Sequence, residues 1–121
     1  MVLLLGSNGF LGRNVLSALL RDGHTVVCLL RNAAALRGCE FEPAVSSGAL
    51  TIVQGSLLDY AMLQSASCGC DAVVNCAGVT DMSLISYDDY LVVNRDLPHL
   101  LVRLLEDNQG LRSLVVSSSL A

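Results

Sequence analysis

The stretch MVLLLGSNGFLG (residues 1–12) decides the fold, because an apolar run leads into three closely spaced glycines. Residues 1–5 are typical of a short strand, and an amphipathic helical pattern begins directly after the glycines. A strand, a glycine-rich turn and a helix N-terminus together form a cradle for a phosphate group. Gly6 permits a tight turn, Gly9 lets the backbone approach a pyrophosphate, and Gly12 allows close packing of helix on strand. The stretch therefore predicts nucleotide binding.

Composition limits the functions that this sequence can have. The 121 residues form one domain at most, and the net charge of −4 makes nucleic acid an unexpected partner. No apolar run approaches the roughly 18–20 residues of a membrane span, and no signal sequence precedes the first strand. We therefore expect a cytoplasmic protein without a membrane partner. All seven basic residues are arginine, so a mechanism that needs a lysine is unavailable to this chain alone.

Five cysteines give an odd number, at positions 28, 39, 68, 70 and 76. The pair Cys68 and Cys70 has no second ligand pair at zinc spacing, so we expect no metal site. We interpret four of the five as small buried side chains.

Strand signals alternate with helical patterns along the whole chain. The expected strands are Val2–Leu5, Thr25–Leu30, Leu50–Val53, Ala72–Asn75 and Ser113–Ser117. Most are continuous apolar runs, as in parallel strands that are covered on both faces. The alternation predicts a Rossmann-type, doubly wound α/β fold whose parallel sheet has the order 3-2-1-4-5. Ligands of such sheets bind at the carboxyl ends of the strands.

Three stretches between the strands have helical features beyond the first helix. Asp59–Ala66 predicts a short helix, and Asn32–Gly48 predicts a short helix with a variable loop. The longest helical pattern covers Asp88–Asp107. Pro98 lies inside it and lacks an N–H donor, so we expect either a kink or a new helix start capped by Asp96.

Five ordered motifs carry a resemblance to a known family. They are the GxxGxxG turn at 6–12, LLD at 57–59, DAVVNCAG at 71–78, YLVVN at 90–94 and LVVSSS at 114–119. With these motifs the chain resembles the extended short-chain dehydrogenase/reductases. Within them it is most similar to the NAD-dependent epimerase/dehydratase group, with its dihydroflavonol-reductase-like and 3β-hydroxysteroid-dehydrogenase-like members. The resemblance implies an oxidoreductase that transfers a hydride, or an epimerase or dehydratase that borrows a hydride and returns it.

The same resemblance implies a catalytic serine after the fifth strand, followed by a Tyr-x-x-x-Lys helix. Ser119 matches the catalytic serine by its place in the Ser-Ser-Ser run. Tyr60, Tyr87 and Tyr90 all precede the fifth strand, and no lysine exists to serve them. We therefore expect an NAD(P)-binding domain (1–121) that is truncated after strand five. Its small-molecule substrate would be bound by a missing C-terminal lobe, and the isolated chain would be inactive.

Residues at two strand ends are assigned to the adenosine side of the cofactor. The second strand ends in Arg31 and Asn32, with no carboxylate for a ribose 2′-OH and with a guanidinium suited to a 2′-phosphate. This favours NADP over NAD. Ser56 and Leu57 stand where the family has Asp-Leu, whose carboxylate contacts the adenine amino group.

Other residues are assigned to the pyrophosphate and to the nicotinamide side. The N–H groups of Phe10 and Leu11 are expected to face the pyrophosphate, and Ser7 and Asn8 belong to the same turn. The resemblance implies that Asn94 holds backbone and water geometry beside the site, although Leu97-Pro98 replaces the family's usual Gly-Thr. Small residues after the fourth strand would let the backbone approach the nicotinamide-side ribose; they are Cys76, Ala77 and Gly78.

Three interpretations of the function remain open. The chain is the cofactor-binding domain of an enzyme, a non-catalytic nucleotide-binding module (a sensor or a structural subunit), or a non-functional fragment. A Tyr-x-x-x-Lys motif encoded downstream would support the enzyme. Truncation also predicts an exposed apolar face and an open strand edge, through which the chain would associate.

Overall fold

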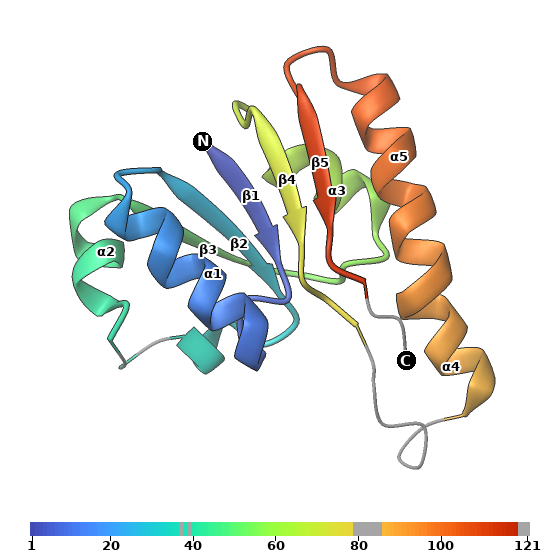
Figure 1. Ribbon diagram of the computed structural model, residues 1–121, viewed down its shortest axis with the longest axis horizontal. Helices are drawn as coiled ribbons and strands as arrows, with labels where there is room; N and C mark the ends of the chain where they lie inside the picture. Colours follow the sequence, from blue (N-terminus) through green and yellow to red (C-terminus); the bar gives the residue numbers. More distant parts are fainter. Residues whose placement is uncertain (37, 39, 79–85, 119–121) are drawn as a thin grey trace.

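A computed structural model describes residues 1–36, 38, 40–78 and 86–118. Its described strands form a single parallel sheet in the order β3-β2-β1-β4-β5 (Figure 1). This confirms the Rossmann-type fold and the strand order expected from the sequence. The strands are β1 (Val2–Leu5), β2 (Val26–Leu30), β3 (Leu50–Gln54), β4 (Ala72–Asn75) and β5 (Ser113–Val116).

Helices cover both faces of this sheet. On one face, α1 packs its Leu16 against buried side chains of β1 and β2. On the other face, α3 and α5 bury Leu63, Leu101 and Leu104 against the same two strands and β4. The helices are α1 (Phe10–Arg21), η1 (Ala33–Leu36, a 3-10 turn), α2 (Glu42–Ser47), α3 (Tyr60–Ala66), α4 (Tyr87–Leu91), η2 (Val92–Asp96, a π-helical turn) and α5 (Leu97–Asp107).

Helix α3 begins where the sequence predicts it. The Asp59 carboxylate accepts a hydrogen bond from the N–H of Met62 at 3.3 Å, as an N-cap residue should. The segment after β2 differs from the single short helix expected there, because it contains both η1 and α2.

The chain stays helical from α4 through α5, and the expected cap by Asp96 is wrong. Asp96 has helical backbone angles (φ −74°, ψ −38°), and its carboxylate accepts from the Arg95 guanidinium at 2.7 Å. The N–H of Leu97 bonds to the carbonyl of Val92, five residues back. Because Pro98 has no N–H to donate, this wider turn lets the helix pass the proline without a new start.

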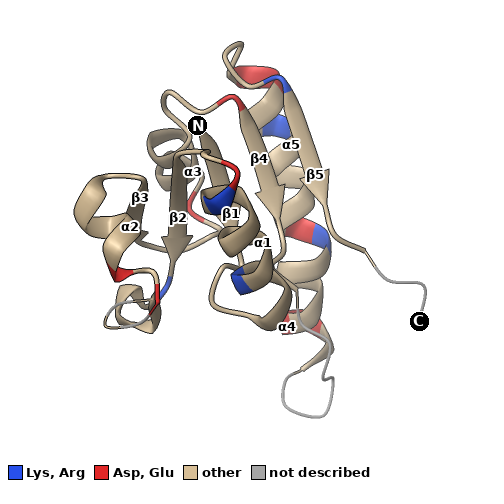
Figure 2. Cartoon of the chain, turned by 60° about the vertical axis from the view of Figure 1, so that its left-hand side comes forward, with Lys and Arg blue, Asp and Glu red and all other residues tan. Residues whose placement is uncertain are grey.

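The sheet ends at β5, which pairs only with β4 among the described strands. Val115 is 55 % exposed and Val116 is 41 % exposed, so apolar surface lies open at this edge. Figure 2 shows acidic and basic residues mixed over the helices and loops. None of the described helices is long and apolar enough to cross a membrane.

Candidate functional site

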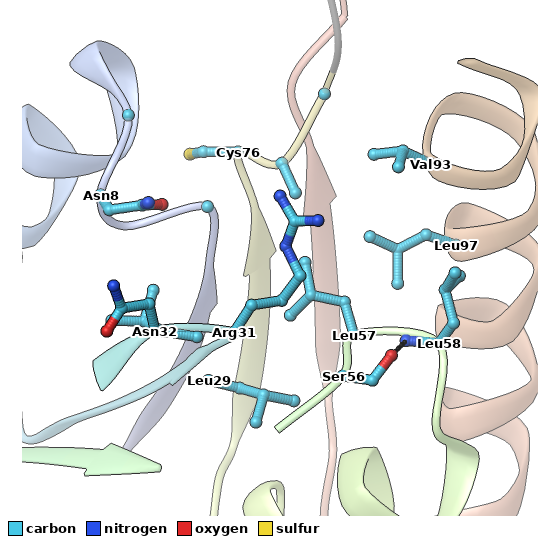
Figure 3. Close-up of a pocket in the computed structure, with 15 residues that line it drawn as sticks. Asn8, Leu29, Arg31, Asn32, Ser56, Leu57, Leu58, Cys76, Val93 and Leu97 are labelled. Carbon is cyan, nitrogen blue, oxygen red and sulfur yellow. Dashed lines mark hydrogen bonds between the residues drawn. The ribbon is translucent and has the colours of Figure 1, made fainter. Parts of the chain in front are cut away.

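A pocket of about 480 Å³ lies at the carboxyl ends of β1, β2 and β4, where the fold predicts a ligand (Figure 3). It gathers most of the residues that the sequence assigned to a cofactor. Those that line it are Gly6, Asn8, Gly9, Arg31, Asn32, Ser56, Leu57, Cys76, Ala77 and Gly78.

The glycine turn is packed so tightly that side chains are excluded at two of its positions. Gly6 has a φ of +77°, and a Cβ there would overlap the backbone of Ala77. A Cβ on Gly12 would overlap the carbonyl oxygen of Gly6. At Gly9, by contrast, a Cβ would meet only the Gly6 oxygen, at an ordinary 3.6 Å. Gly6 and Gly12 thus shape the turn, while Gly9 leaves an open surface beside it.

The first turn of α1 offers N–H groups without a side-chain cap. Gly9 is the N-cap residue and cannot accept a hydrogen bond through a side chain, and the first turn holds no acidic residue. In α3 the same position is filled by the Asp59 carboxylate. An uncapped helix start of this kind favours an anion.

Most side chains of the turn do not reach the pocket. Ser7 is fully buried, Phe10 is 89 % exposed and Leu11 is 48 % exposed. None of the three, nor Gly12, lines the pocket. A role for them in binding must therefore come through the backbone, and it remains a prediction.

Arg31 and Asn32 form the rim of the pocket after β2. Figure 3 shows the Arg31 side chain extending into the pocket. The Asn32 side-chain oxygen accepts a hydrogen bond from the N–H of Ala34 at 3.1 Å. No Asp or Glu is among the described residues that line the pocket. The rim is therefore positively charged.

The opposite wall is fixed by Asn75, which is 1 % exposed. Its side-chain oxygen accepts from the N–H of Ala77 at 3.0 Å. Its backbone carbonyl accepts from both the N–H and the hydroxyl of Ser117, at 3.0 and 3.2 Å. Asn94 does not line the pocket, although a Cβ on Gly78 would come within 3.4 Å of its side-chain oxygen.

The remaining wall is more apolar than the sequence suggested. Ser56 lines the pocket, and its hydroxyl oxygen accepts from the N–H of Leu58 at 3.2 Å. Val93 and Leu97 reach the pocket from η2 and α5. Their spacing of four residues, with Asn94 between them, was the one available signal. The lining residues that the sequence did not assign are Leu29, Leu30, Leu58, Val93 and Leu97.

The cysteines near the site stay protonated at neutral pH. Burial raises the pKa of Cys76, and burial raises the pKa of Cys28 to about 11 although the Ser7 hydroxyl opposes the shift. Neither thiol is therefore a ready nucleophile. Cys28 and Cys70 are buried, but Cys76 is half-buried and Cys68 is exposed, so the expectation of four buried cysteines is wrong. Cys39 and the proposed catalytic Ser119 lie outside the described residues.

Comparison with known proteins identifies a matching family. The model of the NAD dependent epimerase/dehydratase family matches residues 2–121. Phenylcoumaran benzylic ether reductase PT1 of Pinus taeda is 37 % identical over 81 residues, which cover 64 % of this chain and 26 % of that protein. A decarboxylating sterol-4-alpha-carboxylate 3-dehydrogenase of Dictyostelium discoideum is 31 % identical over 100 residues, or 83 % of this chain and 29 % of that protein. The chain thus spans little more than a quarter of these relatives.

Solved structures share the fold. A short-chain dehydrogenase/reductase superfamily protein from Agrobacterium tumefaciens with bound NAD is 28 % identical, with a TM-score of 0.77 over 98 % of this chain and 32 % of that chain. UDP-glucose-4-epimerase from Stenotrophomonas maltophila, with NAD and formylated UDP-arabinopyranose, has a TM-score of 0.80 over 98 % of this chain and 37 % of that chain. Its identity is 24 %, so this second likeness concerns the fold alone.

Proposed function

The chain belongs to the NAD dependent epimerase/dehydratase family, and from this premise we propose that it binds NADP(H) for an oxidoreductase, epimerase or dehydratase. The single observation that carries the proposal is the pocket at the carboxyl ends of β1, β2 and β4. Its base is a glycine turn and its rim is an arginine. The similar short-chain dehydrogenase/reductase superfamily protein from Agrobacterium tumefaciens contains bound NAD, which supports a nicotinamide dinucleotide as the ligand class.

The glycine turn fits the pyrophosphate of such a cofactor. The N-terminus of α1 presents uncapped N–H groups, and the open surface at Gly9 lets an anion come close to them. A Cβ at Gly12 would push the helix away from the turn. These residues hold the cofactor without any charged side chain in the turn.

Arg31 supports NADP(H) over NAD(H). A ribose 2′-OH is usually recognised by a carboxylate near the end of the second strand, and the described pocket has none there. A guanidinium suits a 2′-phosphate, to which it donates charge-assisted hydrogen bonds.

The other walls of the pocket would orient the reactive end of the cofactor. When bound, the cofactor supplies or takes up a hydride at its nicotinamide ring. Small residues at 76–78 leave space for it, and Val93 and Leu97 make one wall apolar and keep water away from it. Asn75 holds the wall formed by residues 76–78 in place, because its side-chain oxygen accepts a hydrogen bond from the N–H of Ala77. We assign the substrate, a small molecule, to parts of the fold outside this pocket.

A second candidate function is a nucleotide-binding module without catalysis. The specific observation is that these 121 residues contain no lysine, so they cannot supply the Tyr-x-x-x-Lys pair that the family resemblance implies. Both candidates require dinucleotide binding. They differ in whether the natural gene product oxidises NADPH when a carbonyl substrate is present.

The test of binding is a fluorescence titration of the purified chain with NADPH and with NADH. We expect NADPH to bind about tenfold more tightly, because a charge-assisted hydrogen bond to phosphate contributes roughly 1.5–3 kcal/mol. Arg31→Gln should remove most of this preference. Arg21→Gln is the matched control, because Arg21 lies in the last turn of α1, away from the pocket.

Two outcomes would contradict the proposal at different levels. Equal binding of both cofactors, or tighter binding of NADH, would contradict the role of Arg31. Binding of neither would contradict the function itself.

A further inference from the structure

β3 is the open edge of the sheet on the side away from β5. Among the described strands it pairs only with β2, in parallel and without a break in register. At one end the N–H of Val26 donates to the carbonyl of Ala49 at 2.9 Å, and at the other the N–H of Gly55 donates to the carbonyl of Leu30 at 2.8 Å. Because the bonding direction alternates along a strand, the odd-numbered residues of β3 face β2. Residues 50, 52 and 54 therefore turn their N–H and C=O groups outward.

The residues of β3 do not protect this edge. Leu50–Gln54 contains no proline and no charged residue, and its pairing with β2 has no bulge. Natural edge strands usually carry such features, because free N–H and C=O groups pair with any extended chain. The strand therefore offers a backbone template to which another strand can be added.

A groove of about 480 Å³ lies between this edge and α2, which runs beside β3 (Figure 1). One side of the helix and the first part of the strand line it. We call it the β3 groove, and its residues are Glu42, Val45, Gly48, Leu50, Thr51 and Ile52. It shares no residue with the cofactor pocket and is about as large, so it has room for more than one side chain.

The side chains of the β3 groove determine what fits into it. Val45 and Ile52 are half-buried and pack against the core cluster that also contains Leu16 of α1. Glu42 is exposed and is the one charged residue of the groove. Its carboxylate accepts a hydrogen bond from the N–H of Gly38 at 3.2 Å, which leaves its negative charge in place. Because side chains alternate along a strand, every second residue of an added strand would lie on the Ile52 side and meet this apolar and acidic surface.

We propose that the β3 groove binds an extended segment of a partner protein, which adds to β3 as a further strand. Alternate residues of this segment are apolar and pack against Val45 and Ile52, and a lysine or arginine on the same face pairs with Glu42. Main-chain hydrogen bonds to residues 50, 52 and 54 hold the segment in place. This interaction goes beyond the cofactor-binding function and does not depend on it.

The probe is a fluorescently labelled synthetic peptide, acetyl-Lys-Thr-Val-Thr-Val-Thr-Lys-amide. Its lysines and valines lie on one face when it is extended. It reads the same in both directions, so it fits a parallel or an antiparallel added strand. We expect saturable binding to the purified chain in fluorescence anisotropy. The same peptide with N-methyl groups on all its valines and threonines should bind at least about tenfold more weakly, because it lacks the N–H donors of an added strand.

Glu42→Gln removes the charge of the β3 groove and keeps its shape. We expect about two- to fivefold weaker binding of the lysine peptide, the range for an exposed ion pair. A peptide with glutamine in place of both lysines should bind the wild-type chain and Glu42→Gln equally. Glu106→Gln is the matched control, because Glu106 is an exposed residue of α5 outside the groove.

Amide hydrogen exchange identifies the edge that the peptide covers. The N–H of Ile52 faces outward, so the bound peptide should slow its exchange by at least about tenfold. The N–H of Thr51 faces β2 and is already bonded in the free chain, so its exchange should change by less than about twofold. A peptide bound to any other surface would not produce this difference between neighbouring residues.

Saturable binding with selective protection of Ile52 would support the proposal. It would be overturned if the peptide does not bind, or if it binds and leaves the exchange of Ile52 unchanged. It would also be overturned if Ile52 becomes protected without peptide as the protein concentration rises, because a second copy of the chain would then occupy the edge. Thermal melting confirms that each variant is folded. A failure of this proposal leaves cofactor binding standing, because NADPH titration measures a separate pocket.

Discussion

Single glycines in the turn at 6–12 have different tasks although they look alike in the sequence. Gly12 packs against the Gly6 carbonyl with no space for a side chain, while the position of a Cβ on Gly9 is open. Substitutions at Gly12 and at Gly9 therefore test two different properties, the stability of the turn and its ability to bind a cofactor.

Gly12→Ala should destabilise the protein, and Gly9→Ala should not. We expect the first change to lower the free energy of unfolding by about 1–3 kcal/mol, the usual cost of overpacking. The second should change it by less than about 0.5 kcal/mol. It should nevertheless weaken NADPH binding, because the added methyl group occupies the surface next to the α1 N-terminus. Urea denaturation and cofactor titration of both variants measure this. Equal stability of the two variants would contradict the assignment.

Residues of the site could be predicted from the sequence where a short motif or the end of a strand marks them. Gly6 and Arg31 follow from the spacing of the turn and from the end of the second strand, and both line the pocket. Val93 and Leu97 could not be assigned, because they reach the pocket only through the packing of a helix some 60 residues further along the chain than Arg31. Asn94, expected beside the site, lies next to Gly78 and outside the pocket lining, to which Val93 and Leu97 contribute instead.

At the scale of elements, α3 and α5 are joined by a cluster of three side chains. The Tyr60 hydroxyl donates to the Asp107 carboxylate at 2.5 Å, and the Arg103 guanidinium lies 4.0 Å from the centre of the Tyr60 ring. The hydrogen bond to Asp107 is the largest cause that raises the pKa of Tyr60, since it favours the protonated phenol.

This cluster predicts a loss of stability at high pH. Because folding raises the pKa of Tyr60, the folded state keeps a proton that the unfolded state has lost. The contribution is complete below the unfolded value of about 10, and it is lost as the pH rises through the folded pKa. An ultraviolet titration of tyrosinate should show one late-titrating tyrosine, which Asp107→Asn returns toward about 10. An unchanged titration in that variant would contradict the prediction.

The long helical pattern at 88–107 contains a feature that the sequence did not predict, the course of the backbone just before Pro98. Its apolar spacing predicts the helix, and Pro98 correctly marks its one irregular place. The sequence did not decide between a new start and a continuous helix, because Asp96 could either cap a helix or pair with Arg95. In the structure it pairs with Arg95, and the π-helical turn η2 satisfies the backbone instead.

For the molecule as a whole, the strand order was predictable because buried parallel strands are continuous apolar runs between helical patterns. What the sequence could not show is how unevenly the sheet is covered. β1 and β2 are buried along their whole length, whereas Val115 and Val116 of β5 are exposed.

We expect the purified chain to associate through β5. An unpaired edge strand with exposed apolar side chains is a template for another chain. Val115→Ser should reduce concentration-dependent association in sedimentation velocity. Val102→Ser is the matched control, because Val102 is 48 % exposed on α5 and Val115 is 55 % exposed. A monomer at all concentrations, or an equal effect of both changes, would contradict the prediction.

The position of β1 in the sheet has a consequence during synthesis. β1 leaves the ribosome before the other described strands, yet it lies in the middle of the sheet and pairs with β4, Val2 opposite Ala72. At about 5–20 residues per second, the partner is made roughly 4 to 14 s later. Until then one edge of an entirely apolar strand has no partner, so the nascent chain depends on protection, by the ribosome exit region or by a chaperone, for longer than a protein built from hairpins.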